Sequence, residues 1–135
     1  MSVMPEEQNR PLILVVEDNE RNARLTTEIL EANGYRVVVA REGKHALDAA
    51  ETLRPQLILM DVQLPGMDGM TVTRILKSQP QTADIPIIAV TAHAMPEHRQ
   101  QLLDVGCCSY ITKPISYHQF VEEIGRVLHA ECRTA

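Results

Sequence analysis

Five polar side chains suited to phosphoryl-group chemistry each follow an apolar run that is typical of a β-strand. They are Glu17, Asp18, Asp61, Thr91 and Lys113. Parallel strands place their carboxyl ends at one edge of a sheet, so side chains far apart in sequence converge there. Three carboxylates, a hydroxyl and an ammonium group at one place favour transfer of a phosphoryl group assisted by a divalent metal.

The three acidic residues predict a metal site. Packed together, the carboxylates of Glu17, Asp18 and Asp61 repel one another, and at least one pKa rises unless a cation lies among them. Mg²⁺ fits best, because it keeps several waters and takes only one or two carboxylates plus phosphate oxygen. The opposing interpretation is that acids after strands serve as helix caps, and Asp18 with Asn19 could do only that.

Asp61 is the candidate nucleophile. It ends a buried apolar run and precedes the turn pair Pro65 and Gly66. We expect its carboxylate to be fixed in direction and open to solvent, so that it could attack phosphorus and form an acyl phosphate. Lys113 supplies a mobile positive charge for a phosphoryl oxygen, and Thr91 supplies a hydroxyl donor. Alone, Lys113 would be an ordinary surface charge.

Alternating strand and helix patterns are expected to position these side chains. Strands are predicted near residues 12–16, 36–40, 57–61, 86–90 and 109–112. Helices are predicted over residues 20–33, 43–53, 68–78, 96–106 and 116–128. The first, third and fourth strands are nearly continuous in apolar residues, as in strands covered on both faces. The pattern predicts an α/β fold: a five-stranded parallel sheet with helices on both faces.

Composition limits the function classes. A chain of 135 residues fits one domain, predicted over residues 11–129, with a flexible tail over 1–10 and a short one over 130–135. The net charge of −5 argues against nucleic-acid binding. No apolar run approaches the length of a membrane span, and the first ten residues do not resemble a signal peptide. The three cysteines form no disulfide framework and are interpreted as thiols. These features favour a cytoplasmic location.

Four segments carry a resemblance to a known family. They are Leu14–Asn19, Leu59–Gly69, Val90–Ala92 and Tyr110–Pro114. With them, residues 12–128 resemble a response-regulator receiver domain, the CheY-like partner of histidine kinases. Details of the sequence are similar to receivers of hybrid kinases and to DivK-type single-domain regulators. The resemblance implies a doubly wound, flavodoxin-like (βα)5 fold with strand order 2-1-3-4-5.

The resemblance also implies roles for the site residues. Asp61 matches the phosphorylated aspartate of the family, and Lys113 matches the lysine that pairs with the phosphoryl group. Asp18 matches a direct Mg²⁺ ligand and Glu17 a ligand that acts through water. The remaining protein ligands are Asp61 itself and the backbone carbonyl of Gln63.

A second set of positions is implied to change or tune the signal. Thr91 and Tyr110 match the switch pair, which rearranges when the aspartate is phosphorylated. Gln63 and His93 match positions that tune the lifetime of the phosphoryl group. The Lys113–Pro114 peptide bond is implied to be cis.

The function implied is that of a single-domain response regulator in a two-component or phosphorelay system. Its partners would be a histidine kinase, a histidine phosphotransfer protein, or both, and a downstream protein that binds the last two helices and the last strand. It would not be an enzyme beyond its own phosphorylation and autodephosphorylation. A monomer and a weak dimer through the last helix are both compatible with the sequence.

Two alternatives stay open. Phosphatases of the haloacid-dehalogenase type also use a strand-end aspartate with Mg²⁺, but they need an acid two residues further on, where this chain has Gln63. A pseudo-receiver scaffold would bind a partner without phosphorylation. Such scaffolds usually lack the acidic pocket or the lysine, whereas this chain keeps both.

Overall fold

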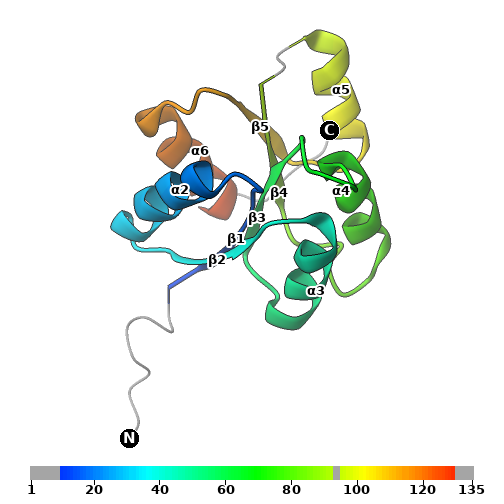
Figure 1. Ribbon diagram of the computed structural model, residues 1–135, viewed down its shortest axis with the longest axis horizontal. Coiled ribbons are helices and arrows are strands. Elements are labelled where there is room, and N and C mark those ends of the chain that lie inside the picture. Colours follow the sequence, from blue (N-terminus) through cyan, green and yellow to red (C-terminus); the bar gives the residue numbers. More distant parts are fainter. Residues whose placement is uncertain (1–9, 93–94, 130–135) are drawn as a thin grey trace, which may run out of the picture.

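Five strands and five helices alternate along the chain (Figure 1). The computed structural model describes residues 10–92 and 95–129, so His93 and most of both predicted tails lie outside the described residues. The elements are β1 (Leu12–Val16), α2 (Glu20–Ala32), β2 (Arg36–Ala40), α3 (Gly43–Leu53), β3 (Leu57–Asp61), α4 (Gly69–Ser78), β4 (Ile87–Thr91), α5 (Pro96–Asp104), β5 (Ser109–Thr112) and α6 (Tyr117–His129).

The strands form one parallel sheet in the order β2-β1-β3-β4-β5, which confirms the predicted fold. Every residue of β1, β3 and β4 is buried, as their continuous apolar sequences indicate. The strands end level with one another, since Val16 pairs with Met60, Asp61 with Val90 and Thr91 with Thr112. The side chains at these ends therefore share one edge of the sheet.

Helices cover both faces of the sheet. Figure 1 shows α2 and α6 on one side of it and α3, α4 and α5 on the other. The first side is packed with the aromatic ring of Phe120 and aliphatic side chains such as Leu30 and Ile124. The second side packs Ala46, Val72 and other apolar residues against the sheet. Alternate residues of each strand face opposite layers, which is why the buried strands are apolar throughout.

Strand β4 lies one residue later than predicted. The sequence pattern indicated residues 86–90, whereas the strand spans Ile87–Thr91. Proline has no backbone N–H and cannot donate to the ladder, so Pro86 precedes the strand, although its carbonyl accepts from the Ile58 N–H at 3.0 Å. Thr91 is consequently the last residue of the strand, and its backbone is held by the sheet and not by a loop.

Helix caps explain two of the helix starts that lie near the strand ends. The Asp68 carboxylate accepts from the Thr71 N–H at 2.8 Å, which confirms the predicted acidic cap of α4. The Asn19 side chain accepts from the Asn22 N–H at 3.0 Å and caps α2. Because Asn19 alone caps this helix, the neighbouring Asp18 carboxylate stays available for another role.

The interpretation of all three cysteines as thiols is wrong for Cys108, which is disulfide-bonded. Cys107 is buried and free. The two adjacent residues lie on opposite sides of the sheet: Cys107 belongs to the core under α3, α4 and α5, and Cys108 packs against the core under α2 and α6. Their different chemistry follows from this alternation, which composition alone does not reveal.

Gly69 brings the first turn of α4 against the end of β3. Its N–H donates to the Val62 carbonyl at 3.0 Å. A Cβ atom at this position would lie 2.3 Å from the Asp61 carbonyl oxygen and 2.8 Å from the Val62 Cα. These are backbone atoms that cannot rotate away. Only glycine therefore allows α4 to pack this closely beside Asp61.

We predict that Gly69→Ala destabilises the protein by roughly 1–3 kcal/mol, because α4 or the end of β3 must shift to admit the methyl group. Thermal unfolding measures this loss. Gly125→Ala is the matched control, since a Cβ there meets nothing within 4 Å. Equal stability of Gly69→Ala and wild-type protein would contradict the steric argument.

Candidate functional site

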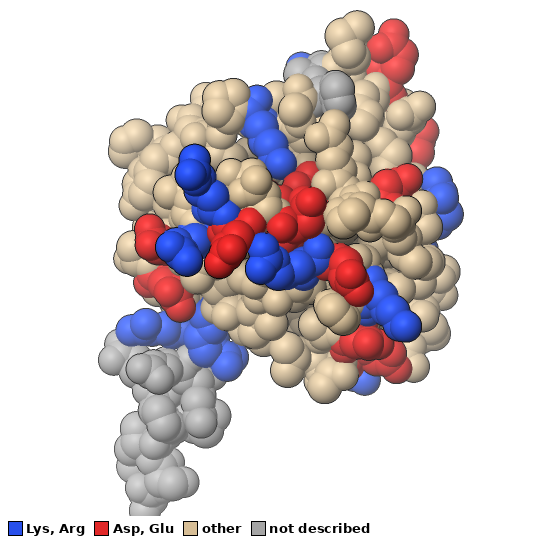
Figure 2. All heavy atoms as spheres, viewed as in Figure 1, with Lys and Arg blue, Asp and Glu red and all other residues tan. Residues whose placement is uncertain are grey.

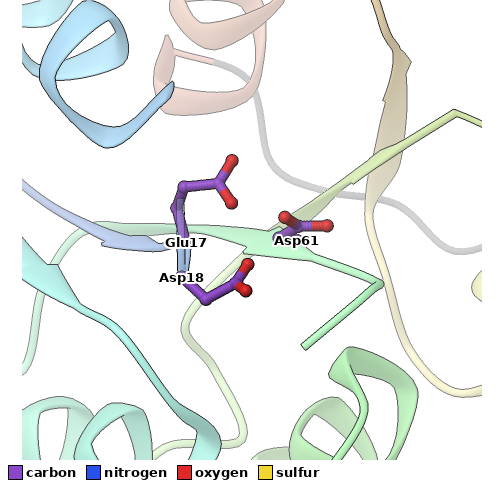
Figure 3. A group of neighbouring side chains, drawn as sticks. All are labelled: Glu17, Asp18 and Asp61. Carbon is purple, nitrogen blue, oxygen red and sulfur yellow. The ribbon is translucent and has the colours of Figure 1, made fainter. Parts of the chain in front are cut away.

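Three carboxylates meet where β1 and β3 end. Glu17 and Asp18 follow β1, and Asp61 is the last residue of the neighbouring strand β3. Figure 3 shows the Glu17 and Asp18 side chains both extending toward Asp61. One ligand oxygen from each residue lies within 4.8 Å of the others. This is the convergence that the sequence predicted.

Asp61 is held by two donors. Its Oδ2 lies 3.1 Å from the Lys113 Nζ, and its Oδ1 accepts from the Gln63 N–H at 2.9 Å. The same Lys113 Nζ lies 3.7 Å from a Glu17 carboxylate oxygen. The lysine is positioned by its backbone, whose N–H donates to the Thr91 carbonyl at 2.7 Å. The Lys113–Pro114 peptide bond is cis, as the resemblance implied. One ammonium thus faces two carboxylates.

Asp61 is less open than the sequence suggested, because only 4% of the residue is exposed. Access to it comes through a cavity of about 490 Å³ that Glu17, Asp61 and Lys113 line on one side. The rest of its lining is mostly apolar, with Leu25 of α2 and Phe120 of α6 among the side chains, and also includes the polar Asn22 and Thr26. The expected exposure failed because α2 and α6 rise beside the strand ends, yet the cavity leaves room for an incoming group.

The Glu17 carboxyl has a strongly raised pKa. Its pKa is raised to about 7, first because burial removes water from the charged form and next because Asp61 lies beside it as hydrogen-bond partner and as a negative charge. The Asn19 N–H and the Lys113 ammonium act in the opposite direction but do not compensate. Without a cation nearby, the Glu17 carboxyl therefore keeps its proton to a higher pH than an ordinary glutamate does.

The predicted switch residues occupy neighbouring strands. Thr91 ends β4 and is 1% exposed, while Tyr110 lies in β5 opposite Ala89. Each contacts α5: the Thr91 Oγ1 lies 3.1 Å from the His98 Nε2, and the Arg99 guanidinium carbon lies 5.3 Å from the centroid of the Tyr110 ring. The sequence analysis did not predict the contact of His98 with the switch threonine.

Three further positions named in the sequence analysis have different outcomes. Gln63 is exposed and lies beside Asp61, because its backbone N–H donates to the Asp61 carboxylate. His93 lies outside the described residues. Gly69 belonged to the segment that carried the resemblance, but its steric role beside Asp61 was not predicted. A glycine one residue after a helix cap was the available signal.

Charges of both signs are mixed on the face shown in Figure 2, where acidic side chains gather near the centre and lysine and arginine side chains lie around them. No extended basic stripe appears on this face, in keeping with the net charge of −5. Among the described residues, no helix has both the length and the apolar character needed to cross a bilayer.

We predict that Glu17→Gln stabilises the metal-free protein above pH 7. The folded-state pKa of Glu17, about 7, lies above its ordinary value of 4.5. Folding therefore favours the protonated form of Glu17. The contribution of this residue to the free energy of unfolding is complete below about pH 4.5 and is lost as the pH rises through 7. A neutral glutamine does not titrate, so the variant should gain up to about 3 kcal/mol at pH 8 and little at pH 5.

Thermal unfolding in EDTA across this pH range measures the difference. Glu20→Gln is the control, because the Glu20 side chain is exposed and pairs with Arg24 of the same helix, away from the carboxylate cluster. An equal gain at pH 5 and pH 8 would show that titration of residue 17 is not the cause.

Known proteins are similar to this chain in sequence and in fold. The family model for the response regulator receiver domain matches residues 13–125. The polar-differentiation response regulator DivK of Brucella anthropi is 46% identical over 112 residues, which cover 83% of this chain and 91% of that protein. The DivK protein of Brucella ovis matches to the same extent.

Solved structures agree with the sequence matches. The receiver domain of the sensor histidine kinase PA1611 from Pseudomonas aeruginosa PAO1, with a magnesium ion coordinated in its active-site cleft, is 35% identical with a TM-score of 0.83, covering 90% of this chain and 99% of that one. The chemotaxis response regulator CheY4 of Vibrio cholerae is 28% identical with a TM-score of 0.84, covering 88% and 99%. Neither group of relatives is a phosphatase, so that alternative has no support. On sequence and fold together, the chain belongs to the response regulator receiver family and is DivK-like.

Proposed function

We propose that this protein accepts a phosphoryl group on Asp61 from a phosphohistidine of a histidine kinase or a histidine phosphotransfer protein, within a two-component or phosphorelay system. The observation that carries this proposal is the Asp61 carboxylate, held between the Lys113 ammonium at 3.1 Å and the Gln63 N–H at 2.9 Å, facing a cavity of about 490 Å³. The similarity to DivK response regulators supports it.

The reaction needs little covalent chemistry from the protein. A carboxylate oxygen of Asp61 forms a bond to phosphorus as the phosphorus–nitrogen bond of the donor breaks, and the imidazole leaves with the bonding electron pair. Transfer of this kind depends on positioning and on neutralising charge. Lys113 would pair with a phosphoryl oxygen, and Thr91, at the end of the adjacent strand, would supply a hydroxyl donor.

The acidic cluster fits a hard divalent cation. Three carboxylates offer oxygen ligands within 4.8 Å of one another. The pKa of Glu17 is raised first by burial and next by the neighbouring Asp61, and a cation would relieve the second of these effects. Asp18, Asp61 and the Gln63 carbonyl would hold Mg²⁺ directly, and Glu17 would act through water. When bound, Mg²⁺ would neutralise charge on the transferring group. The magnesium in the PA1611 receiver domain supports this assignment.

Phosphorylation would act through the switch pair. The new group carries up to two negative charges and offers acceptors to Thr91 and Lys113. Thr91 would turn toward it and Tyr110 would move inward, which changes the face formed by α5, β5 and α6. A downstream protein would bind that face in one state only. Gln63 and His93 would tune the lifetime of the phosphoryl group through water access.

A pseudo-receiver scaffold is the competing function. It would bind its partner with the same fold and without phosphoryl transfer. The retained carboxylate cluster and the Lys113–Asp61 pair favour the phosphorylated receiver, because neither feature is needed for passive binding. The following experiment separates the two.

We predict that wild-type protein incubated with acetyl phosphate and Mg²⁺ gains the mass of one phosphoryl group, and that Asp61→Asn gains none. The asparagine amide is too weak a nucleophile to replace the carboxylate. Intact-protein mass spectrometry measures the adduct, and EDTA should suppress it. Asp48→Asn, which alters an exposed carboxylate on α3, is the control and should label like wild type. An unlabelled wild-type protein would favour the scaffold.

We predict that Lys113→Ala still accepts the phosphoryl group but roughly 100-fold more slowly, because one electrostatic partner of the transferring group is lost. The phosphorylated variant should also fail to switch. Intact mass over time measures the first effect, and the NMR signals of Tyr110 with and without phosphodonor measure the second. Lys44→Ala, on the exposed surface of α3, is the control. A normal Tyr110 response in Lys113→Ala would contradict this role.

A further inference from the structure

Helix α5 contacts both members of the switch pair through two consecutive residues. The His98 Nε2 lies 3.1 Å from the Thr91 Oγ1. The Arg99 guanidinium carbon lies 5.3 Å from the centroid of the Tyr110 ring, which is within the range of a cation–π contact. Figure 1 shows α5 following β4 and leading back to β5, the two strands that carry these residues. One turn of α5 therefore contacts both switch residues.

We propose that His98 is a positioning residue that holds the Thr91 hydroxyl in the unphosphorylated arrangement and so opposes switching. This proposal rests on the proposed function, because it concerns the same switch threonine. A threonine hydroxyl has one proton and few accessible rotamers. When the hydroxyl donates to the imidazole, that proton is committed, and the bond must break before it can serve a phosphoryl oxygen on Asp61.

The other tautomer leads to the same outcome. If the His98 Nε2 carries the proton, it donates to the Thr91 oxygen and fixes that oxygen on the α5 side. Rotation of the hydroxyl toward Asp61 breaks this hydrogen bond as well. The contact is thus a property of the resting arrangement in both tautomers.

Thr91 and His98 differ in burial, so the loss of their contact affects the two side chains differently. Thr91 is 1% exposed, so in the resting arrangement its hydroxyl needs a protein partner. His98 is only partly buried, so water can hydrate its ring after release. Release therefore costs about one neutral hydrogen bond, which corresponds to a roughly 2- to 12-fold bias toward the resting arrangement. That bias is small enough for a charged phosphoryl group to overcome.

The Arg99 contact extends this restraint to the second switch residue. If the Tyr110 ring moves from its present position, it loses its contact with the Arg99 guanidinium that lies over it. Because His98 and Arg99 are adjacent on α5, release of one contact and displacement of the helix would affect the other. The helix then reports the state of Thr91 to the surface that α5 forms with β5 and α6.

A double-mutant cycle with beryllofluoride, a non-covalent phosphoryl mimic, tests the proposal. Isothermal titration with Mg²⁺ present gives the apparent affinity of wild type, His98→Ala, Thr91→Ala and the double variant. We expect His98→Ala to bind beryllofluoride about 2- to 12-fold more tightly than wild type, since the restraint is gone. In the Thr91→Ala background, His98→Ala should have no effect, because the restrained hydroxyl is absent.

Gln100→Ala is the matched control on the same helix. Gln100 is exposed and bonds Asp104 within α5, so its removal should leave the affinity unchanged. Unchanged or weaker binding by His98→Ala would overturn the proposal, as would an equal effect in both backgrounds, which marks a general role in packing. In each of these cases a wild-type protein that binds beryllofluoride leaves the proposed function standing. A wild-type protein that binds none would overturn both.

Discussion

Crowding of like charges at the ends of β1 and β3 is the constraint on which the site depends. Parallel pairing brings Glu17 and Asp18 beside Asp61, and the described side chains place one ammonium, that of Lys113, within 4 Å of two of them. The arrangement is costly: burial and the neighbouring Asp61 both raise the pKa of Glu17. Folding offsets that cost through the continuous apolar core on both faces of the sheet. The fold thus maintains a site with an excess of negative charge.

That excess gives the site its chemical selectivity. A site balanced by a second lysine would satisfy Asp61 fully and would have little affinity for a cation. With two close carboxylates per ammonium, added positive charge is favourable, and a metal ion can then compensate an arriving phosphoryl group. Close packing accompanies this charge arrangement, because Gly69 allows α4 to approach the backbone at the end of β3 that carries Asp61.

The fold and the convergence of the residues after the strands were predictable, because both depend on the local sequence pattern. Continuous apolar runs mark strands buried on two faces, and residues directly after such runs must meet at one sheet edge. The Asp68 cap follows from the same local rules. The near-complete burial of Asp61 and the disulfide at Cys108 were not predictable, because they depend on how α2, α6 and neighbouring segments pack. The Thr91–His98 contact likewise depends on the rotation of α5, which no short sequence window specifies.

The strengths of the two competing contacts of Thr91 decide whether such a fold can act as a switch. A neutral hydrogen bond to His98 contributes about 1 kcal/mol net, whereas hydrogen bonds to a charged group contribute roughly 1.5–3 kcal/mol each. Two such hydrogen bonds, from Thr91 and Lys113, would therefore bias the equilibrium by about 3–6 kcal/mol toward the phosphorylated arrangement. A resting restraint of about 1 kcal/mol suppresses switching in the absence of phosphate without preventing it in its presence. A salt bridge in the place of the Thr91–His98 contact would compete too strongly, and a bare hydrophobic contact would not hold the hydroxyl.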